Sequence, residues 1–528
     1  MSGNLRHERR SGSTGSSFDF PPNSSGFPPD TPSSRLRSRL TGSTLVLFVC
    51  AALLAGCASS ESTTPSKSKS KSQAQPAASS AAPTAPVPSS SSKPAASSSG
   101  ATPPATGPTF KQAADYLAAG DTNRAIQVFQ QLVDRSPGNI AQQIQFARLL
   151  ISAGKLSEAR EVLKPVLARA PENIDALFNM ALLEDSDGNT KSEQQYLEKI
   201  ISIDPTNSDA NASMGQLYLA DNKPDKAGAT FEKSLKSNPD NLTALMGEGN
   251  VLLQQGDPKR ASAMFDHAIK LQPGLSFAYG DRAAARLQTE DYQGAEKDLT
   301  KAIQLDPSYY WHYIDRGKLR LQYGNNKKGA LEDFKTAVKL NPGYFLGYVY
   351  LAGLYDEEKD YTNAGLNYKK LLELRPDYYF VYRPYAVILY MEKKWSLARE
   401  YFEKARKAEP TDYGSQMFVV LTYLKEKNNP DATIYLKQMI AELPRDGLFY
   451  SLAKMYLDPS YDVYFISRMK EEKNPDVRTR MLFYLACFYE LRGKTALAQQ
   501  YFLDVESHPV EGMWEYAVNK WELENYRK

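Results

Sequence analysis

Ten prolines recur along the chain at an almost constant interval. They stand at positions 137, 171, 205, 239, 273, 307, 342, 376, 410 and 444, so every step is 34 residues except one step of 35. Proline ends a helix because it lacks the backbone N–H and fixes its own φ angle. An interval of this length holds two helices and two turns, and a fixed period of this kind is typical of stacked helical units. The pattern predicts an all-α repeat fold.

Small residues keep the same phase as the prolines. One set falls where the first helix of each unit would cross its partner closely: Ala113, Ala147, Ala181, Gly215, Gly249, Ala283, Gly317, Ala352 and Ala386. A second set falls near the start of the second helix: Ala125, Ala159, Ala227, Ala261, Ala295, Ala330, Ala364, Ala398 and Ala432. A large apolar residue such as Phe129 or Phe334 follows the second set four residues later. Turn-forming pairs such as Gly120-Asp121 separate the two predicted helices.

These slots resemble the tetratricopeptide repeat (TPR) family over about residues 106–446. The resemblance implies a right-handed TPR superhelical solenoid of about ten to eleven helix-turn-helix repeats, with ten units at 109–446. One unit departs from the pattern by placing Glu193 where alanine is expected. The one-residue slip lies at Asn325-Asn326, in a predicted turn, where an insertion costs little.

The pattern loosens in the C-terminal region, 447–528. Residues 448–473 read as two shorter helices interrupted by Asp458-Pro459, and a further unit is expected at about 479–510. A last amphipathic helix at 511–526 carries Trp514 and Trp521, and it is predicted to be a capping helix because a solenoid must cover its terminal apolar face. The segment that begins Arg478-Thr479-Arg480 is similar in character to the end of NlpI-type TPR lipoproteins of the outer membrane.

The first 57 residues read as a lipoprotein signal peptide with a long n-region. An uncharged run of twelve residues, Thr44 to Ala55, is too short to span a bilayer and follows three arginines. It ends in Leu54-Ala55-Gly56-Cys57, which resembles the lipobox of bacterial lipoproteins and implies lipidation at Cys57. Ala58 after the cysteine favours the outer membrane by the same resemblance. The alternative is an ordinary signal peptide, or a short buried helix, with a chance cysteine.

Residues 58–108 are predicted to be a disordered tether. Of these 51 residues, 41 are Ser, Ala, Pro or Thr, and none is aromatic. Such a segment cannot bury enough apolar surface to offset the entropy of ordering it. We therefore expect this segment to be a flexible linker between the anchor and the repeats.

Charge and composition exclude several function classes. Beyond the first 57 residues, basic and acidic side chains balance at 58 each, so the chain lacks the electrostatic footprint of a nucleic-acid binder. The whole chain holds only four His and three Cys. His267, His312 and His508 fall in separate units, and Cys487 has no partner at close sequence range. We expect no metal site, no cofactor and no catalytic residue.

One segment imitates a calcium loop. Asp185 to Asn189 has the alternating acids of such a loop, but the sixth and twelfth positions hold Thr190 and Tyr196 in place of Gly and Glu. It is predicted to be the turn of the third unit.

Aromatic residues gather in the first helices of the later units. In the TPR family the first helices line a concave groove that receives a peptide or a partner segment. The slots expected to face inward hold Asn250, Gln254, Asp281, Trp311, Lys318, Tyr350, Arg383 and Tyr390. Trp, Tyr and Arg are enriched in binding hot spots. The alternative is that these tyrosines pack between helices, in which case the C-terminal helix with Trp514 and Trp521 becomes the expected binding surface.

Two functions remain for such a chain. The first is a lipid-anchored scaffold or adaptor of the bacterial cell envelope that binds other proteins or peptide segments in its groove, without catalysis of its own. By resemblance, such lipoproteins recruit cell-wall enzymes or help assemble envelope machines. The alternative is a surface-exposed adhesin or receptor that uses the same solenoid on an external ligand.

Overall fold

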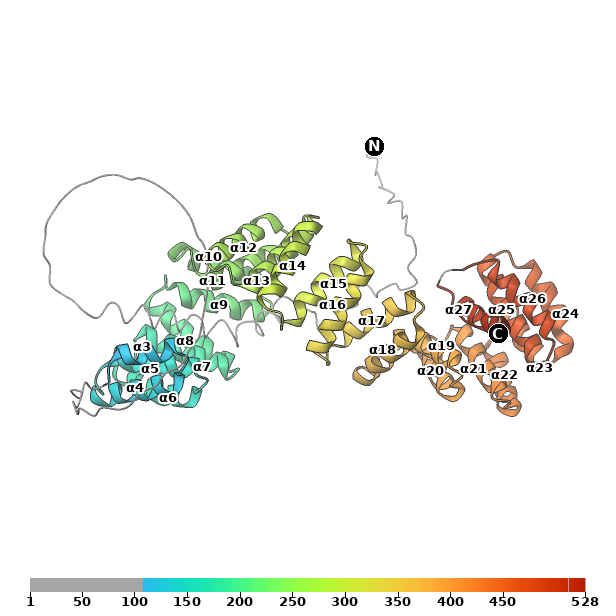
Figure 1. Ribbon diagram of the computed structural model, residues 1–528, viewed down its shortest axis with the longest axis horizontal. Helices are drawn as coiled ribbons and strands as arrows, with labels where there is room; N and C mark the ends of the chain where they lie inside the picture. The colour runs from blue at the N-terminus through green and yellow to red at the C-terminus, as the bar shows by residue number, and fades with distance from the viewer. Residues whose placement is uncertain (1–107, 511, 528) are drawn as a thin grey trace, which may run out of the picture. The chain divides into compact units, whose positions relative to one another are not determined.

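The computed structural model describes residues 108–510 and 512–527 (Figure 1). Within these residues the chain is all α-helix apart from turns and two short 3-10 segments, and no strand occurs among them. The described helices divide between two compact units, one that ends at Pro273 and one that begins at Gly274. The predicted signal peptide, Cys57 and nearly all of the tether lie outside the described residues.

From residue 108 on, where the description begins, the unit that ends at Pro273 contains five helix pairs. Its helices are α3 (Phe110–Ala118), α4 (Thr122–Arg135), α5 (Ile140–Ser152), α6 (Leu156–Arg169), α7 (Ile174–Ser186), α8 (Thr190–Ile203), α9 (Ser208–Ala220), α10 (Pro224–Ser237), α11 (Leu242–Gln254) and α12 (Pro258–Leu271).

The unit that begins at Gly274 continues the helix pairs and adds the C-terminal elements. Its helices are α13 (Ser276–Gln288), α14 (Tyr292–Leu305), α15 (Tyr310–Gln322), α16 (Lys327–Leu340), α17 (Phe345–Glu357), α18 (Tyr361–Leu374), η1 (Tyr379–Val381), α19 (Tyr382–Met391), α20 (Trp395–Ala408), α21 (Tyr413–Lys425), α22 (Asn429–Glu442), α23 (Leu448–Leu457), η2 (Pro459–Tyr461), α24 (Asp462–Glu471), α25 (Pro475–Glu490), α26 (Thr495–Glu506) and α27 (Trp514–Arg527). The all-helical repeat fold expected from the sequence is confirmed.

The turn inside each pair has one left-handed residue in a fixed place. These residues have positive φ and recur with the period of the prolines: Gly120, Gly154, Gly188, Asn222, Gly256, Glu290, Asn325, Lys359, Lys393 and Lys427. Glycine adopts this conformation without a steric cost, whereas a residue with a Cβ does not. The same backbone turn is therefore kept where the sequence no longer has its glycine.

The small-residue slots are the places where helices meet. Every alanine of the two sets is buried. Gly215 shows the reason, because a Cβ added there would lie 2.5 Å from Cε1 of Phe231. Gly249 faces Phe265 in the same way, also at 2.5 Å. The first helix of a pair thus presents a small residue to the aromatic ring of the second, and Glu193, the exception, is buried on α8.

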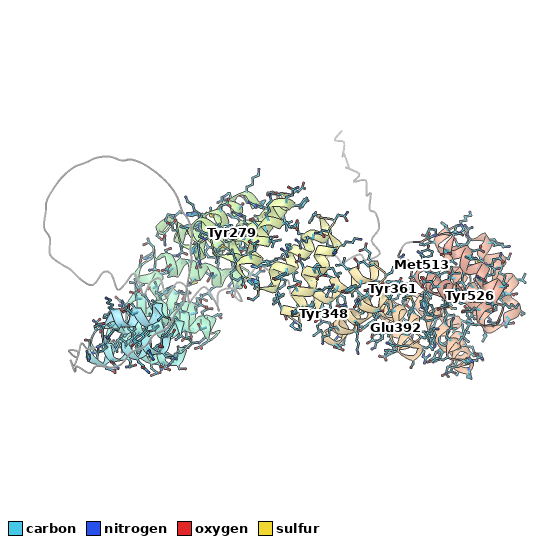
Figure 2. All side chains as sticks on the ribbon, viewed as in Figure 1. Tyr279, Tyr348, Tyr361, Glu392, Met513 and Tyr526 are labelled. Carbon is cyan, nitrogen blue, oxygen red and sulfur yellow. The ribbon has the colours of Figure 1, made fainter. Side chains whose placement is uncertain are left out.

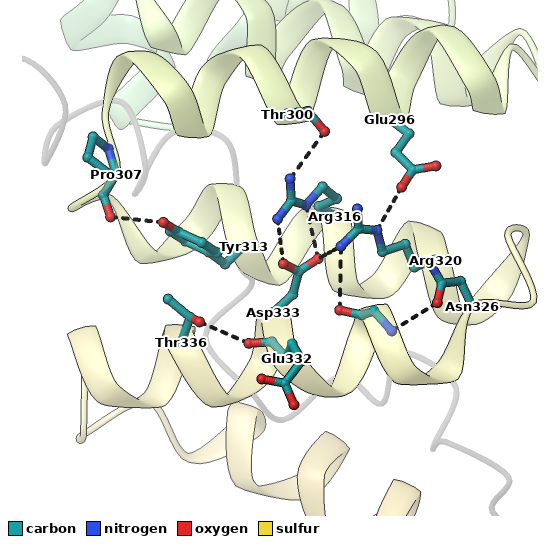
Figure 3. Close-up of polar contacts among 11 residues, drawn as sticks. Glu296, Thr300, Pro307, Tyr313, Arg316, Arg320, Asn326, Glu332, Asp333 and Thr336 are labelled. Atoms are coloured by element: carbon teal, nitrogen blue, oxygen red, sulfur yellow. Dashed lines mark hydrogen bonds and ion pairs between the residues drawn. The ribbon is translucent and has the colours of Figure 1, made fainter.

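Buried ion pairs join neighbouring helices in the second unit. Asp333 on α16 accepts hydrogen bonds from both Arg316 and Arg320 on α15, with the closest nitrogen–oxygen distances at 2.7 and 2.9 Å (Figure 3). The same arginines reach back to α14, where Arg316 binds Thr300 at 3.1 Å and Arg320 binds Glu296 at 2.7 Å. Each arginine therefore ties one helix pair to the next.

The C-terminal helix does more than cover the end of the repeats. Helix α27 contacts α25 and α26, and it also folds back to contact α19 of the ninth pair. Lys425 on α21 pairs with Glu490 on α25 at 2.6 Å and with Glu522 on α27 at 3.0 Å. Helix α27 thus covers the first helix of an earlier pair. Figure 2 labels Met513, which directly precedes this helix, and Tyr526, which lies near its end. Among the described residues, no helix has both the length and the apolar character needed to cross a bilayer.

Candidate partner-binding pocket

The predicted groove residues divide between the two units. Asn250 and Gln254 lie on α11 in the unit that ends at Pro273, and the other six lie in the unit that begins at Gly274. Gln254 is exposed, whereas Asn250 is buried and donates its side-chain N–H to the carbonyl oxygen of Met246 at 2.9 Å. Only Gln254 of this pair offers a side chain to the solvent.

Three groove candidates in the second unit are largely packed. Asp281 and Trp311 are buried, and the Trp311 ring packs edge-on against Tyr344 with centroids 5.1 Å apart. Tyr350 is partly buried and stacks on Phe334 at 4.5 Å. Lys318 is partly exposed on α15. Packing between helices therefore accounts for much of the aromatic density in this region.

Tyr390 needs a correction, because its side chain is fully buried. The prediction that it offers its ring to a partner does not fit this burial. It contacts Trp395, Phe418 and, on the terminal helix, Trp521. The repeat pattern predicts an inward-facing slot for Tyr390, but helix α27 covers that part of α19. Burial follows from a contact with a segment about 130 residues away, which the repeat pattern alone does not reveal.

Part of the aromatic pattern belongs to the repeat turn. Tyr313, Tyr348 and Tyr382 stand six residues after a proline, and each hydroxyl donates a hydrogen bond to the carbonyl oxygen of that proline. The distances are 3.2 Å for Tyr313 and Pro307, 3.3 Å for Tyr348 and Pro342, and 2.6 Å for Tyr382 and Pro376. Figure 3 shows the first of these bonds. These hydrogen bonds join the proline turn between two pairs to the first helix of the following pair.

Arg383 is the groove candidate that lies in a pocket. We call this cavity of about 340 Å³ the arginine pocket; it is lined by Arg383, Glu409, Thr411, Asp412, Tyr413, Gly414, Ser415, Phe418, Phe449, Arg480, Trp514 and Glu515. The lining comes from α19, the α20–α21 turn, α21, α23, α25 and α27. The chain therefore builds the pocket where its last regular repeats meet the C-terminal helices.

Arg383 is held in place by the start of α21. Its guanidinium forms an ion pair with Asp412, and its Nε donates to the hydroxyl oxygen of Ser415 at 3.2 Å. The Asp412 carboxylate also accepts the backbone N–H of Ser415 at 3.1 Å, so it caps the helix. Burial lowers the pKa of Arg383, and the positive charge of Arg480 lowers it further. The negative charges of Glu515 and Glu409 oppose this change. About 31% of the Arg383 side chain remains exposed.

Arg480 faces the pocket from α25. Its Nε lies 3.3 Å from Oε1 of Glu515, the same oxygen that accepts a hydrogen bond from the Tyr484 hydroxyl at 2.8 Å. Glu515 is 5% exposed in its side chain, whereas Arg480 is 38% exposed. Glu515 thus accepts a hydrogen bond from the buried Tyr484 hydroxyl and forms an ion pair with Arg480, whose guanidinium is left partly open to solvent.

A smaller cavity of about 120 Å³ adjoins the arginine pocket. The two share Arg383, Glu409, Asp412 and Trp514, and the smaller one adds Tyr379, Phe380, Pro384, Ala405 and Ala408. Tyr379 and Phe380 are both exposed and stack on each other with centroids 4.1 Å apart. The combined cleft therefore has a charged end and an aromatic end.

Sequence reasoning found part of this site. Arg383 was a predicted groove residue, and Trp514 belongs to the helix named as the alternative binding surface. Arg480, Glu515 and Phe449 were missed. They lie outside the 34-residue pattern, and the only signal was the aromatic character of the C-terminal region. Their approach depends on how α23, α25 and α27 fold back.

The remaining residues considered for catalysis or metal binding do not line the arginine pocket. Cys487 is fully buried, and burial raises the pKa of its thiol well above the usual value. His267 contacts Asp240 at 2.8 Å, and the ring of His508 lies against Ser507. The calcium-loop mimic ends in the turn of the third pair, where Asp187 binds Arg160 and Gly188 is left-handed. Across residues 108–510 and 512–527, no three His, Cys, Asp or Glu side chains gather as metal ligands would.

Comparison with known families agrees with this architecture. Models described as tetratricopeptide repeat match residues 116–182, 174–207, 196–229, 213–276, 248–310 and 347–378. None of the curated proteins matches the chain.

Several solved structures match part of the chain. A tetratricopeptide repeat protein from Parabacteroides merdae is 22% identical, with 46% of this chain and 96% of that one covered and a TM-score of 0.36. PilF from Pseudomonas aeruginosa is 20% identical, with coverages of 40% and 95% and a TM-score of 0.36. MamA is 23% identical, with coverages of 31% and 94% and a TM-score of 0.29. The repeat period, the helix pairs and the family matches have one common explanation, which is that the helix pairs over residues 116–310 and 347–378 are tetratricopeptide repeats.

Proposed function

We propose that this protein is a lipid-anchored adaptor of the bacterial cell envelope, which binds partner proteins through its repeats and has no catalysis of its own. Tetratricopeptide repeats are scaffolds for protein–protein interaction, and this chain has such repeats. The observation that carries the proposal is the cleft of the second unit, where exposed aromatic rings adjoin two arginines. Aromatic and arginine side chains dominate binding hot spots.

The proposed anchor rests on the residues around Cys57. The lipobox resemblance assigns the lipid to this cysteine, and Ala58 favours the outer membrane. Several acyl chains on one residue hold a protein to a bilayer far better than a single chain does. The tether at 58–108 then lets the repeats reach a partner at some distance from the membrane.

Substitution of Cys57 by serine tests the anchor. Cells that express either form are fed an alkyne-labelled fatty acid and fractionated with a detergent that separates into two phases. The native protein is expected to carry the label and to enter the detergent phase, whereas Cys57→Ser should lose both properties. Retention of the label by Cys57→Ser would refute lipidation at this residue. Cys50→Ser is the matched control, because Cys50 lies in the same segment and precedes the predicted cleavage site.

Partner binding and orientation are tested on intact cells. Crosslinking followed by mass spectrometry should recover the same envelope proteins reproducibly with the native chain and not with a chain that lacks residues 274–528. Protease added outside the cell distinguishes the adaptor from the adhesin or receptor. An inward-facing adaptor survives until the outer membrane is opened, and an exposed receptor is cleaved at once.

A further inference from the structure

The arginine pocket has more hydrogen-bond donors than acceptors to spare. A guanidinium carries five N–H donors. In the described part of the chain, Arg480 has one close acceptor, Oε1 of Glu515, which approaches its Nε. Arg383 uses Nε for Ser415 and Nη2 for Asp412, so its Nη1 is left over. The terminal nitrogens of Arg480 and one of Arg383 are therefore available to a ligand.

Two of the three acidic groups that line the pocket are already engaged. Asp412 accepts hydrogen bonds from the backbone and the hydroxyl of Ser415 and pairs with Arg383. Oε1 of Glu515 accepts from Tyr484 and pairs with Arg480. The remaining acid, Glu409, is exposed to solvent. A cation entering the pocket would meet two guanidiniums, with Asp412 and Glu515 already paired and Glu409 facing the solvent, whereas an anion would meet unused donors.

We propose that the arginine pocket recognises an acidic side chain within a partner peptide, and that an apolar or aromatic neighbour of that residue enters the adjoining cavity. The proposal rests on the partner-binding function proposed above. The planar fork of a guanidinium matches the two oxygens of a carboxylate, so arginine binds such groups with defined geometry. A space of about 340 Å³ accommodates one or two amino-acid side chains rather than a folded surface.

The second cavity is the reason why we expect the acidic residue to lie within the peptide, next to another side chain. It continues from the arginine pocket through the four shared residues, and its aromatic surface is formed by Tyr379 and Phe380. A peptide that runs across both cavities places one side chain in each. Contact with flat, exposed rings stabilises an apolar side chain at little entropic cost, because aromatic side chains have few rotatable bonds.

A peptide library provides the first test. Random twelve-residue peptides displayed on phage are selected against the full-length protein in detergent, and in parallel against Arg480→Gln. Peptides recovered only with the native protein are expected to share an Asp or Glu next to an apolar or aromatic residue. Recovery of no acidic motif, or of the same motif by Arg480→Gln, would overturn the proposal.

Affinity measurements then test the chemistry. With one selected peptide, Arg480→Gln should weaken binding at least tenfold, which corresponds to about 1.4 kcal/mol. Replacing the acidic residue of the peptide by its amide should cost as much, and combining both changes should cost little more. The matched control is Arg478→Gln, because Arg478 is a partly exposed arginine on the same helix that does not line the pocket. Equal losses for Arg478→Gln and Arg480→Gln would contradict a specific pocket.

Two further measurements distinguish the proposal from binding of a terminal carboxylate and from loss of the fold. Amidation of the peptide C-terminus should leave binding unchanged, and a loss would show that a terminal carboxylate is the ligand instead. Melting curves of both variants should match that of the native protein, which separates lost recognition from lost fold. If partners are still crosslinked in cells by Arg480→Gln as efficiently as by the native chain, the adaptor function stands and the pocket proposal fails.

Discussion

Tyr390 and Trp521 pack edge to face, with ring centroids 6.2 Å apart and an interplanar angle of 70°. One ring belongs to the ninth helix pair and the other to the terminal helix. This contact places a residue expected in a groove inside the core. Helix α27 also forms part of the wall of the arginine pocket, because its residues Trp514 and Glu515 line that pocket.

The buried hydroxyl of Tyr390 leads to a first prediction. Within the described residues it makes no hydrogen bond, whereas the equally buried hydroxyl of Tyr484 lies 2.8 Å from Glu515. Burying a polar group without a partner destabilises a fold by about 1–3 kcal/mol. Tyr390→Phe is therefore expected to raise the free energy of unfolding by about 1 kcal/mol, and Tyr484→Phe to lower it by a similar amount. Chemical denaturation of both variants checks the difference in sign. Destabilisation by Tyr390→Phe would show that its hydroxyl has a role in the fold.

A second prediction concerns Lys425. Burial alone would lower its pKa, but Glu522 and Glu490 outweigh burial and raise it. Removing one partner from a buried ion network leaves an uncompensated charge and costs about 3–5 kcal/mol. Lys425→Met should destabilise the protein by that amount, and adding Glu522→Gln should restore part of the loss. Lys437→Met, at an exposed position on α22, is the control and should change stability by less than about 0.5 kcal/mol. A small effect of Lys425→Met would mean that the network does not hold α27.

A third prediction is a pH dependence at Asp356. Burial raises the pKa of this carboxyl to about 6, although the hydrogen bond from Tyr368 opposes the rise. Because the folded protein favours the protonated acid, the stabilising contribution is complete below the unfolded value of 3.8 and is lost as the pH rises through about 6. Asp356→Asn should therefore be more stable than the native protein at pH 8 by about 1–3 kcal/mol and lose this advantage near pH 4. Melting curves at the two pH values measure the effect, with exposed Asp446→Asn as the control. An advantage that is the same at both pH values would exclude titration of Asp356 as the cause.

The left-handed turns provide a fourth prediction. Lys359 has φ of 61° in the turn between α17 and α18. Glycine removes the steric cost of this conformation, which is about 1–2 kcal/mol, but it also makes the unfolded chain more flexible. Lys359→Gly should therefore stabilise the protein by about 0.5–1 kcal/mol. The same substitution at Lys369, inside α18, should destabilise it by about 1 kcal/mol. Thermal unfolding of the two variants gives the comparison, and a loss of stability in both would show that the turn at Lys359 is not strained.

The sequence alone determined the repeat architecture. Prolines, small residues and turn formers act within one unit or between direct neighbours, so their spacing is enough to predict helix pairs. Ala295 and Ala330 are buried at helix crossings, as their slots require. The break at Asp458-Pro459 falls between α23 and α24 for the same local reason, since proline starts a new helical segment there.

Which residues form the cleft depends on how distant helices pack together. Arg383 and Arg480 are almost 100 residues apart, and nothing periodic relates them. Their approach depends on contacts of α25 and α27 with earlier helices, such as the bonds of Lys425 to Glu490 and Glu522. The same contacts bury Tyr390, although its slot in the repeat is equivalent to slots in other units. A repeat pattern specifies what each helix presents, but burial depends on which distant segment covers that face, and this is a property of the packed chain.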